Sequence, residues 1–154
     1  MSMGALEGLK ILVTGQGGIA RAIVTQLVEE GAAVALVGEH ETVLGVSAQV
    51  IGPPANGDWQ AVVAEATHLI GVPTVVIDVV GMPINYALEM PTAAAYTGAV
   101  LGRIEGAMNA AIPGMTAAGG GAVICVGLPM GTEMQVGIPQ WSVLRHSIHG
   151  LVRG

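Results

Sequence analysis

Three small residues near the start of the chain have the spacing of a phosphate-binding turn. Gly15, Gly17 and Ala20 form the pattern G-x-G-x-x-A within "TGQGGIA". The first glycine permits a tight turn, the second lets the backbone approach a pyrophosphate, and the alanine lets a helix pack closely on the preceding strand. The N-terminus of that helix would face the negative charge. If the turn binds a dinucleotide, the contacting residues are Thr14, Gly15, Gln16, Gly17, Gly18 and Ile19.

The acidic residue that would hold the ribose is missing from its expected place. A dinucleotide-binding turn is normally followed, about 20 residues on, by an Asp or Glu at the end of the second strand. Gly38 occupies that place here, and Glu39 follows it. The turn is therefore either a weak NAD site or a relic whose glycines remain because the backbone needs them. We expect weak or absent NAD binding, and no cofactor that this chain requires.

Two histidines and the single cysteine are the other candidates for chemistry. His146 and His149 are three residues apart, so they could ligate a metal from one helical turn. No carboxylate or thiolate near them completes such a site, and we expect surface or interface histidines and no metal. Cys125 lies in an apolar run, which favours a buried, inert thiol.

Strands alternating with helices are predicted along the chain, from the apolar runs and the positions of glycine. Strands are expected at 9–15, 32–38, 48–51, 72–81 and 119–128, and helices at 19–31, 58–70, 92–115 and 138–154, with room for a stub of helix after residue 38. In the first helix, one face carries Ile19, Ile23, Leu27 and Val28. This order predicts one α/β domain over residues 1–154, a Rossmann-like, doubly wound parallel sheet of about five strands.

The composition favours a protein that buries part of its surface in an assembly. Hydrophobic residues make up 52% of the chain and charged residues 10%, fewer than a globular surface normally carries. The alternative is a monomer whose surface is rich in Gly, Ala and Thr. The net charge of −6 argues against nucleic acid and anionic membranes as partners. The first ten residues lack the features of a secretory signal, so we expect a cytoplasmic protein.

In this order and spacing, the segments resemble the short-chain dehydrogenase/reductase family. "LKILVTGQGGIA" is similar to that family's opening strand and T-G-x-x-x-G-x-G turn, with one loop residue fewer. "IDVVG" stands where the family has its N-N-A-G strand end, and "WSVLRHSIHGLVRG" resembles the helix that begins Y-x-x-x-K. The resemblance implies a truncated fold of this family, with a shortened crossover between the second and third strands. Pro53 and Pro54 stand where the family has an adenine-contacting Asp.

All four catalytic positions implied by the resemblance have changed. Trp141 replaces the family's tyrosine, Arg145 its lysine, Leu128 its serine and, within a residue, Val100 its asparagine. In the family, the tyrosine phenol transfers a proton as hydride passes between nicotinamide and substrate. An indole N–H does not titrate usefully and a leucine side chain cannot hydrogen-bond. We therefore expect no catalytic residues in this chain and no dehydrogenase activity.

The resemblance also implies how the chain would assemble. In the family, the helices before and after the fifth strand pair across a subunit interface. The first of these helices is small or apolar all round at Val100, Leu101, Ile104, Ala107, Met108, Ala111 and Ile112, which predicts cover on both sides. We expect a non-catalytic subunit paired, through residues 98–115 and 141–154, with an active relative in a hetero-oligomer such as a tetramer, with NAD bound by the partner. An NAD(H)-binding regulatory module and a homo-oligomeric scaffold are the alternatives.

Overall fold

The chain folds into a single parallel sheet between two layers of helices. The computed structural model describes residues 4–15, 17–38, 45–80, 92–127 and 139–153, and for residues 93 and 139–141 only the backbone. Its strands lie in the order β3-β2-β1-β4-β5. Their bounds are β1 (Lys10–Gly15), β2 (Ala33–Val37), β3 (Gln49–Ile51), β4 (Val75–Val79) and β5 (Ala122–Val126).

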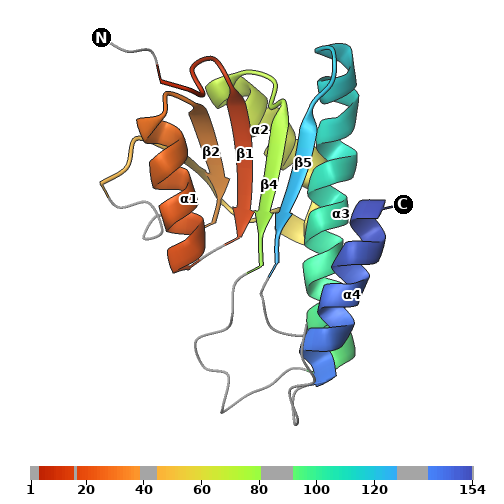
Figure 1. The fold of residues 1–154 in the computed structure, drawn as a ribbon. Coiled ribbons are helices and arrows are strands. Elements are labelled where there is room, and N and C mark those ends of the chain that lie inside the picture. The colour runs from red at the N-terminus through yellow and green to blue at the C-terminus, as the bar shows by residue number, and fades with distance from the viewer. Residues whose placement is uncertain (1–3, 16, 39–44, 81–91, 128–138, 154) are drawn as a thin grey trace.

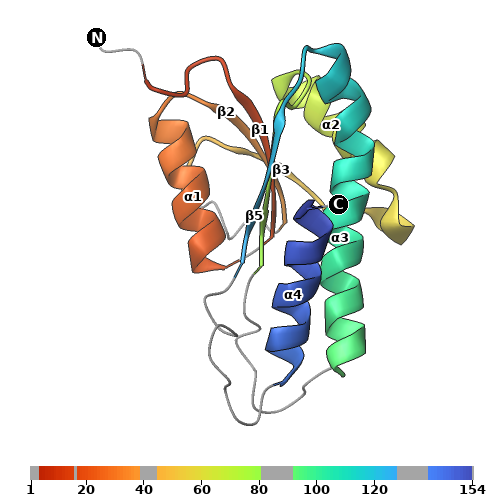
Figure 2. The same ribbon diagram turned by 45° about the vertical axis from the view of Figure 1, so that its right-hand side comes forward.

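Of the α-helices in the described residues, one covers one face of the sheet and three cover the other. They are α1 (Gly18–Glu29) on the first face, and α2 (Trp59–Ile70), α3 (Ala93–Ala117) and α4 (Pro139–Arg153) on the second (Figures 1 and 2). The strand order reverses between β1 and β4, where the connections leave to opposite sides. The predicted doubly wound α/β fold is confirmed, and its helices and strands begin and end within a few residues of the predicted bounds. The predicted helical stub after residue 38 lies largely outside the described residues.

The central strands are buried because helices cover both of their faces. Ile11, Leu12 and Val13 of β1 are almost fully inaccessible, as expected for an apolar run in a parallel sheet. From α1, Ala20 and Val24 pack against the sheet, with Ile23, Leu27 and Val28 at the margin of the contact. Ile19 is 50% exposed. Ala20 and Val24, one position further along the helix, form the inward stripe, and the predicted apolar face lies beside it.

The second layer depends on close contact between α2 and α3. Asp58 begins α2, and its Oδ1 accepts a hydrogen bond from the backbone N–H of Ala61 at 3.1 Å. The indole of Trp59, the first residue of α2, occupies the space beside Gly106 of α3. A Cβ added at Gly106 would lie 2.1 Å from Trp59 Cδ1. A glycine in the middle of α3 thus lets the two helices approach each other.

The inward face of α3 differs from its outward face. Val100, Ile104, Ala107 and Ala111 are buried by this chain's own sheet and helices, and Leu144 and Ile148 of α4 pack against the first two. The outward face carries Gly102, Glu105 and Asn109. Of the seven apolar positions, only Ile112 is exposed, at 41%. Most of the seven residues fill an internal contact, so they do not by themselves call for a partner, and cover of the outward face stays a prediction.

The two helical glycines Gly102 and Gly106 should respond in opposite ways to alanine. Gly102→Ala meets open space and should stabilise the fold by about 0.5–1 kcal/mol, because alanine is the better helix former. Gly106→Ala must displace the Trp59 indole and should destabilise it by about 1–3 kcal/mol. Urea denaturation followed by tryptophan fluorescence measures both. Equal changes in the two variants would contradict the packing described for Trp59.

Candidate functional site: a cleft at the carboxyl ends of the strands

The glycine turn between β1 and α1 has the backbone shape that its sequence predicts. Gly15 has a φ of 116°, and a Cβ there would lie 2.2 Å from the carbonyl oxygen of Val79 on β4. Gly17, with a φ of 92°, is the N-cap of α1, and among the described residues no side-chain hydrogen bond caps this end of the helix. Ala20 is fully buried against the sheet. Packing alone thus explains why small residues stand at positions 15 and 20. Gln16, another of the predicted contact residues, lies outside the described part of the chain.

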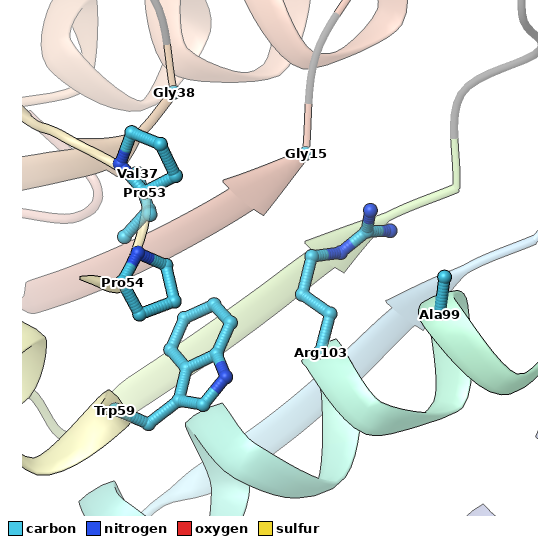
Figure 3. Close-up of a pocket in the computed structure, with 8 residues that line it drawn as sticks. All are labelled: Gly15, Val37, Gly38, Pro53, Pro54, Trp59, Ala99 and Arg103. Atoms are coloured by element: carbon cyan, nitrogen blue, oxygen red, sulfur yellow. The ribbon is translucent and has the colours of Figure 1, made fainter. Parts of the chain in front are cut away.

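Beside this turn a cleft opens at the carboxyl ends of the strands. It has a volume of about 360 Å³. Its described lining combines backbone at the ends of β1 and β2, two proline rings, an indole and a guanidinium: Gly15, Val37, Gly38, Pro53, Pro54, Trp59, Ala99 and Arg103 (Figure 3). Ligands of open α/β sheets bind at this end of the strands, next to the point where the strand order reverses. The position and size therefore suit a small ligand.

One wall of the cleft is an arginine held by a buried carboxylate. Arg103 of α3 donates from Nε to Asp78 Oδ2 at 2.7 Å and from Nη2 to Asp78 Oδ1 at 3.0 Å. The hydroxyl of Thr14 on β1 donates to the same Oδ2 at 2.5 Å. The Asp78 side chain is 2% exposed and that of Arg103 28%. This bidentate pair joins β1, β4 and α3 just below the cleft.

The arrangement limits what the pair can do chemically. Both oxygens of Asp78 accept hydrogen bonds, three in all from Arg103 and Thr14, so the carboxylate is not placed to take a proton from a ligand. The charge of Arg103 is balanced by Asp78, which weakens its attraction for a free anion. Arg103 is thus better suited to shape the cleft wall and to donate a hydrogen bond than to bind phosphate as an isolated cation.

Cys125 is the neighbour of this pair on the sheet. It stands in register with Asp78 on β4, which in turn stands in register with Thr14 on β1. Burial of the thiol raises the pKa of Cys125, and the negative charge of Asp78 raises it further, against an opposing effect of Arg103. The thiol is therefore largely neutral at physiological pH and a poor nucleophile.

The residues that the resemblance aligns with the family's catalytic positions do not line this cleft in the described part of the chain. Val100 is buried between α3 and α4. Arg145 is exposed on α4 and lines a separate hollow beside β5. Leu128 and the side chain of Trp141 lie outside the described part of the chain. The ion pair of Asp78 and Arg103, by contrast, was missed from sequence; its only signals were a lone Asp in an apolar strand and an Arg in a helix with few charges.

Among the described residues, no three or more His, Cys, Asp or Glu side chains are grouped so that they could hold a metal ion. None of the described helices combines the length and apolar character needed to cross a membrane.

The five-stranded doubly wound sheet is the Rossmann-like fold found in short-chain dehydrogenases/reductases. A double mutant of a short-chain dehydrogenase/reductase from Serratia marcescens superposes with a TM-score of 0.70 at 21% identity, over 95% of this chain and 66% of that one. The sequence itself matches no family model and no curated protein.

Two other solved structures are similar. The TT0495 protein from Thermus thermophilus is 27% identical, with a TM-score of 0.72, over 95% of this chain and 65% of that one. A 3-oxoacyl (acyl-carrier-protein) reductase from Agrobacterium tumefaciens C58, solved with NADP bound, is 23% identical, with a TM-score of 0.74, over 95% and 62%. This chain thus spans less than two thirds of the length of the structures that it resembles.

Removing the arginine of the ion pair should be more harmful than removing both partners. Arg103→Met leaves the Asp78 carboxylate buried with the Thr14 hydroxyl as its described donor, and should lower the free energy of unfolding by about 3 kcal/mol. The double variant Asp78→Leu with Arg103→Met removes the buried charge and should recover part of that loss. Chemical denaturation measures both. A double variant that is less stable than Arg103→Met would contradict this account of the pair.

Proposed function

We propose that this chain is a non-catalytic member of the short-chain dehydrogenase/reductase family that pairs, in the cytoplasm, with an active NAD-dependent dehydrogenase subunit. The proposal rests on the contrast between the fold, which is similar to that of these proteins, and the residues at the four catalytic positions, which differ. The fold matches these proteins over 95% of the chain. Leu128, Trp141, Arg145 and Val100 stand at the positions that correspond to the family's serine, tyrosine, lysine and asparagine.

The described residues near the carboxyl ends of the strands support the loss of chemistry. The carboxylate of Asp78 is engaged by Arg103 and Thr14, and the thiol of Cys125 has a raised pKa. Neither replaces the phenol of a tyrosine as an acid or base. Val100, buried between two helices, leaves no polar side chain where the family has an amide.

The partner would be an active relative of the same family, contacted through the outward faces of α3 and α4. On these faces Ile112 and Val143 are exposed apolar side chains, at 41% and 50%. An active and a degenerate subunit occur together in 2-(hydroxybenzyl)succinyl-CoA dehydrogenase, and a hydroxyacyl or alcohol substrate of the partner would suit such a complex. NAD would be bound by the active subunit, and a tetramer is the assembly that we expect.

A second candidate function is a regulatory module that binds NAD(H) without turning it over. The cleft beside Gly15 favours this candidate, because it lies where open α/β sheets bind ligands. Gly38 at the end of β2 offers no carboxylate to a ribose, and a contact of that kind is worth about 1.5–3 kcal/mol, roughly ten- to a hundredfold in affinity. A micromolar NAD site in calorimetry, abolished by Gly17→Val, would favour the regulatory module over the subunit.

The purified chain should not transfer hydride between NAD(H) or NADP(H) and an alcohol or ketone. The double variant Trp141→Tyr with Arg145→Lys should not restore activity, because Leu128 and Val100 remain apolar. Turnover is measured from the absorbance of the reduced nicotinamide, with a panel of short-chain and acyl-CoA alcohols as substrates. Cofactor-dependent turnover that persists after contaminating dehydrogenases are removed would rule out a non-catalytic subunit.

A charge on the outward face of α3 or α4 should release the partner. Ile112→Glu and Val143→Glu place a carboxylate where the interface would desolvate it, and each should abolish co-purification with the active relative. Leu69→Glu on α2, with a similarly exposed apolar side chain, is the matched control and should leave the complex intact. If Ile112→Glu and Val143→Glu both keep the complex, and circular dichroism shows that both are folded, then the partner binds elsewhere on the surface.

A further inference from the structure

The side chains around the cleft at the carboxyl ends of the strands offer hydrogen-bond donors to a ligand. Trp59 and Arg103 are the two polar side chains in its described lining, and both can only donate. The other described side chains of the lining belong to valine, alanine and two prolines, which carry no polar atom. Among the described side chains of this cleft there is thus no hydrogen-bond acceptor. A ligand that presents acceptors therefore fits these walls better than one whose hydroxyl groups need acceptors, such as a ribose.

The guanidinium of Arg103 keeps a donor beyond those that hold it in place. Nε and Nη2 donate to Asp78, and Nη2 also donates to the backbone carbonyl of Val79 at 3.4 Å. This side-on contact leaves Nη1 on the edge of the guanidinium that is turned away from the carboxylate. No described residue accepts a hydrogen bond from Nη1, and the side chain is 28% exposed. A donor whose position is fixed by the ion pair is therefore available to a ligand in the cleft.

The other side of the cleft is an apolar wall. Figure 3 shows the rings of Pro53, Pro54 and Trp59 on one side and Arg103 on the other. The indole of Trp59 is held in place by Gly106 of α3, where an added Cβ would lie 2.1 Å from Trp59 Cδ1. Indole and pyrrolidine rings together give a surface against which a planar ring can pack. The cleft thus combines an apolar wall with a fixed donor across from it.

Charge and size narrow the class of ligand further. The carboxylate of Asp78, which is 2% exposed, already balances the charge of Arg103. A ligand carboxylate at Nη1 would bring a second negative charge to the same guanidinium, whereas an uncharged carbonyl accepts the hydrogen bond without that repulsion. The cleft volume of about 360 Å³ is close to the lower end of the range for ligand pockets, roughly 300–1,000 Å³. A ligand of one or two fused rings fits this volume better than a dinucleotide.

We propose that the cleft binds a small, flat, uncharged ring compound that carries a carbonyl group, such as an aromatic amide or a lactam, in preference to a dinucleotide. The ring would pack against Trp59 and Pro54, and the carbonyl oxygen would accept a hydrogen bond from Nη1 of Arg103. Gly38 and the two prolines supply no side chain that could hold a ribose or a phosphate, and this ligand needs none. The proposal differs from a regulatory NAD(H) module in the class of ligand. It does not depend on a partner or on the catalytic state of the protein.

A matched series of three indole derivatives tests the proposal. Indole-5-carboxamide carries an uncharged carbonyl, indole-5-carboxylate has the same shape with a negative charge, and 5-methylindole lacks the oxygen. On the full chain, labelled with nitrogen-15 at both tryptophans, the amide should shift the indole N–H signal of Trp59 with a dissociation constant of about 1 mM or lower. Trp141→Phe identifies that signal, since it removes the other indole. The carboxylate and 5-methylindole should each bind about fivefold more weakly, or weaker still. Equal affinity for either of them would overturn the proposal.

Two substitutions on α3 test where the amide binds. Ala99→Phe fills the cleft from an exposed position of the helix, and should weaken binding of the amide about tenfold or more. Ala94→Phe makes the same change at an exposed position that does not line the cleft, and should leave the affinity within about twofold. Equal affinities of the two variants, when circular dichroism shows that both are folded, would place the amide outside the cleft and overturn the proposal.

The double variant Asp78→Leu with Arg103→Met tests the hydrogen bond, because it removes the donor together with the buried charge. The preference for the amide over 5-methylindole should fall to within about twofold, while 5-methylindole itself binds as before. This ratio compares two ligands of one variant, so a general loss of stability does not imitate it. A preference that survives the double substitution would contradict the role of Arg103.

NAD separates this proposal from the regulatory module. It should shift the Trp59 signal only at millimolar concentration and should not displace the amide. NAD that binds at micromolar concentration and displaces the amide would overturn the proposal and favour the regulatory module. The non-catalytic subunit is tested by hydride transfer and by co-purification, so its failure is distinguishable from a failure of the ligand proposed for the cleft.

Discussion

The buried carboxylate of Asp78 constrains much of the second helical layer. An ionised group that is only 2% exposed requires partners, since an unpaired charge in the interior is very costly. One partner, Thr14, is adjacent on β1, and the other, Arg103, comes from α3. The bidentate geometry fixes how far α3 lies along the sheet and which of its faces turns inward. With Arg103 directed at β4, the adjacent Ile104 and, one turn further along, Ala107 lie in the interior.

The same interaction shapes the cleft and limits its chemistry. Arg103 forms a wall beside Gly15 and opposite Trp59, and its position is held from below by a group that solvent cannot reach (Figure 3). A fixed wall favours selective binding of a small ligand, because the side chain loses little further freedom when the ligand arrives. The carboxylate that fixes it is thereby unavailable as a base. A cleft of this kind suits binding better than turnover, which is consistent with the non-catalytic role that we propose.

Local patterns predicted the fold and the glycine turn because each depends on neighbouring residues. The buried run of β1 and the need for glycine at position 15 follow from short stretches of sequence, and both predictions are confirmed. The ion pair could not be predicted, since Asp78 and Arg103 are 25 residues apart and only the packing of α3 brings them together. The seven apolar residues of α3 did not by themselves indicate a partner, because most of them are buried by the sheet and helices of this chain. Sequence alone did not distinguish a helix buried by its own chain from one buried by a partner.

Parallel pairing of β1 with β4 has a consequence for how the chain reaches this structure. Thr14 and Asp78, in register on adjacent strands, are 64 residues apart in sequence, so this contact closes a long loop. At about 5–20 residues per second, synthesis of the intervening chain takes roughly 3–13 seconds. During that interval β1, whose Ile11, Leu12 and Val13 are buried in the folded protein, has emerged without β4, the neighbour with which it pairs. The nascent chain therefore passes through a state that is prone to aggregate on the ribosome, and binding of a chaperone to residues 10–15 would be most useful before β4 emerges.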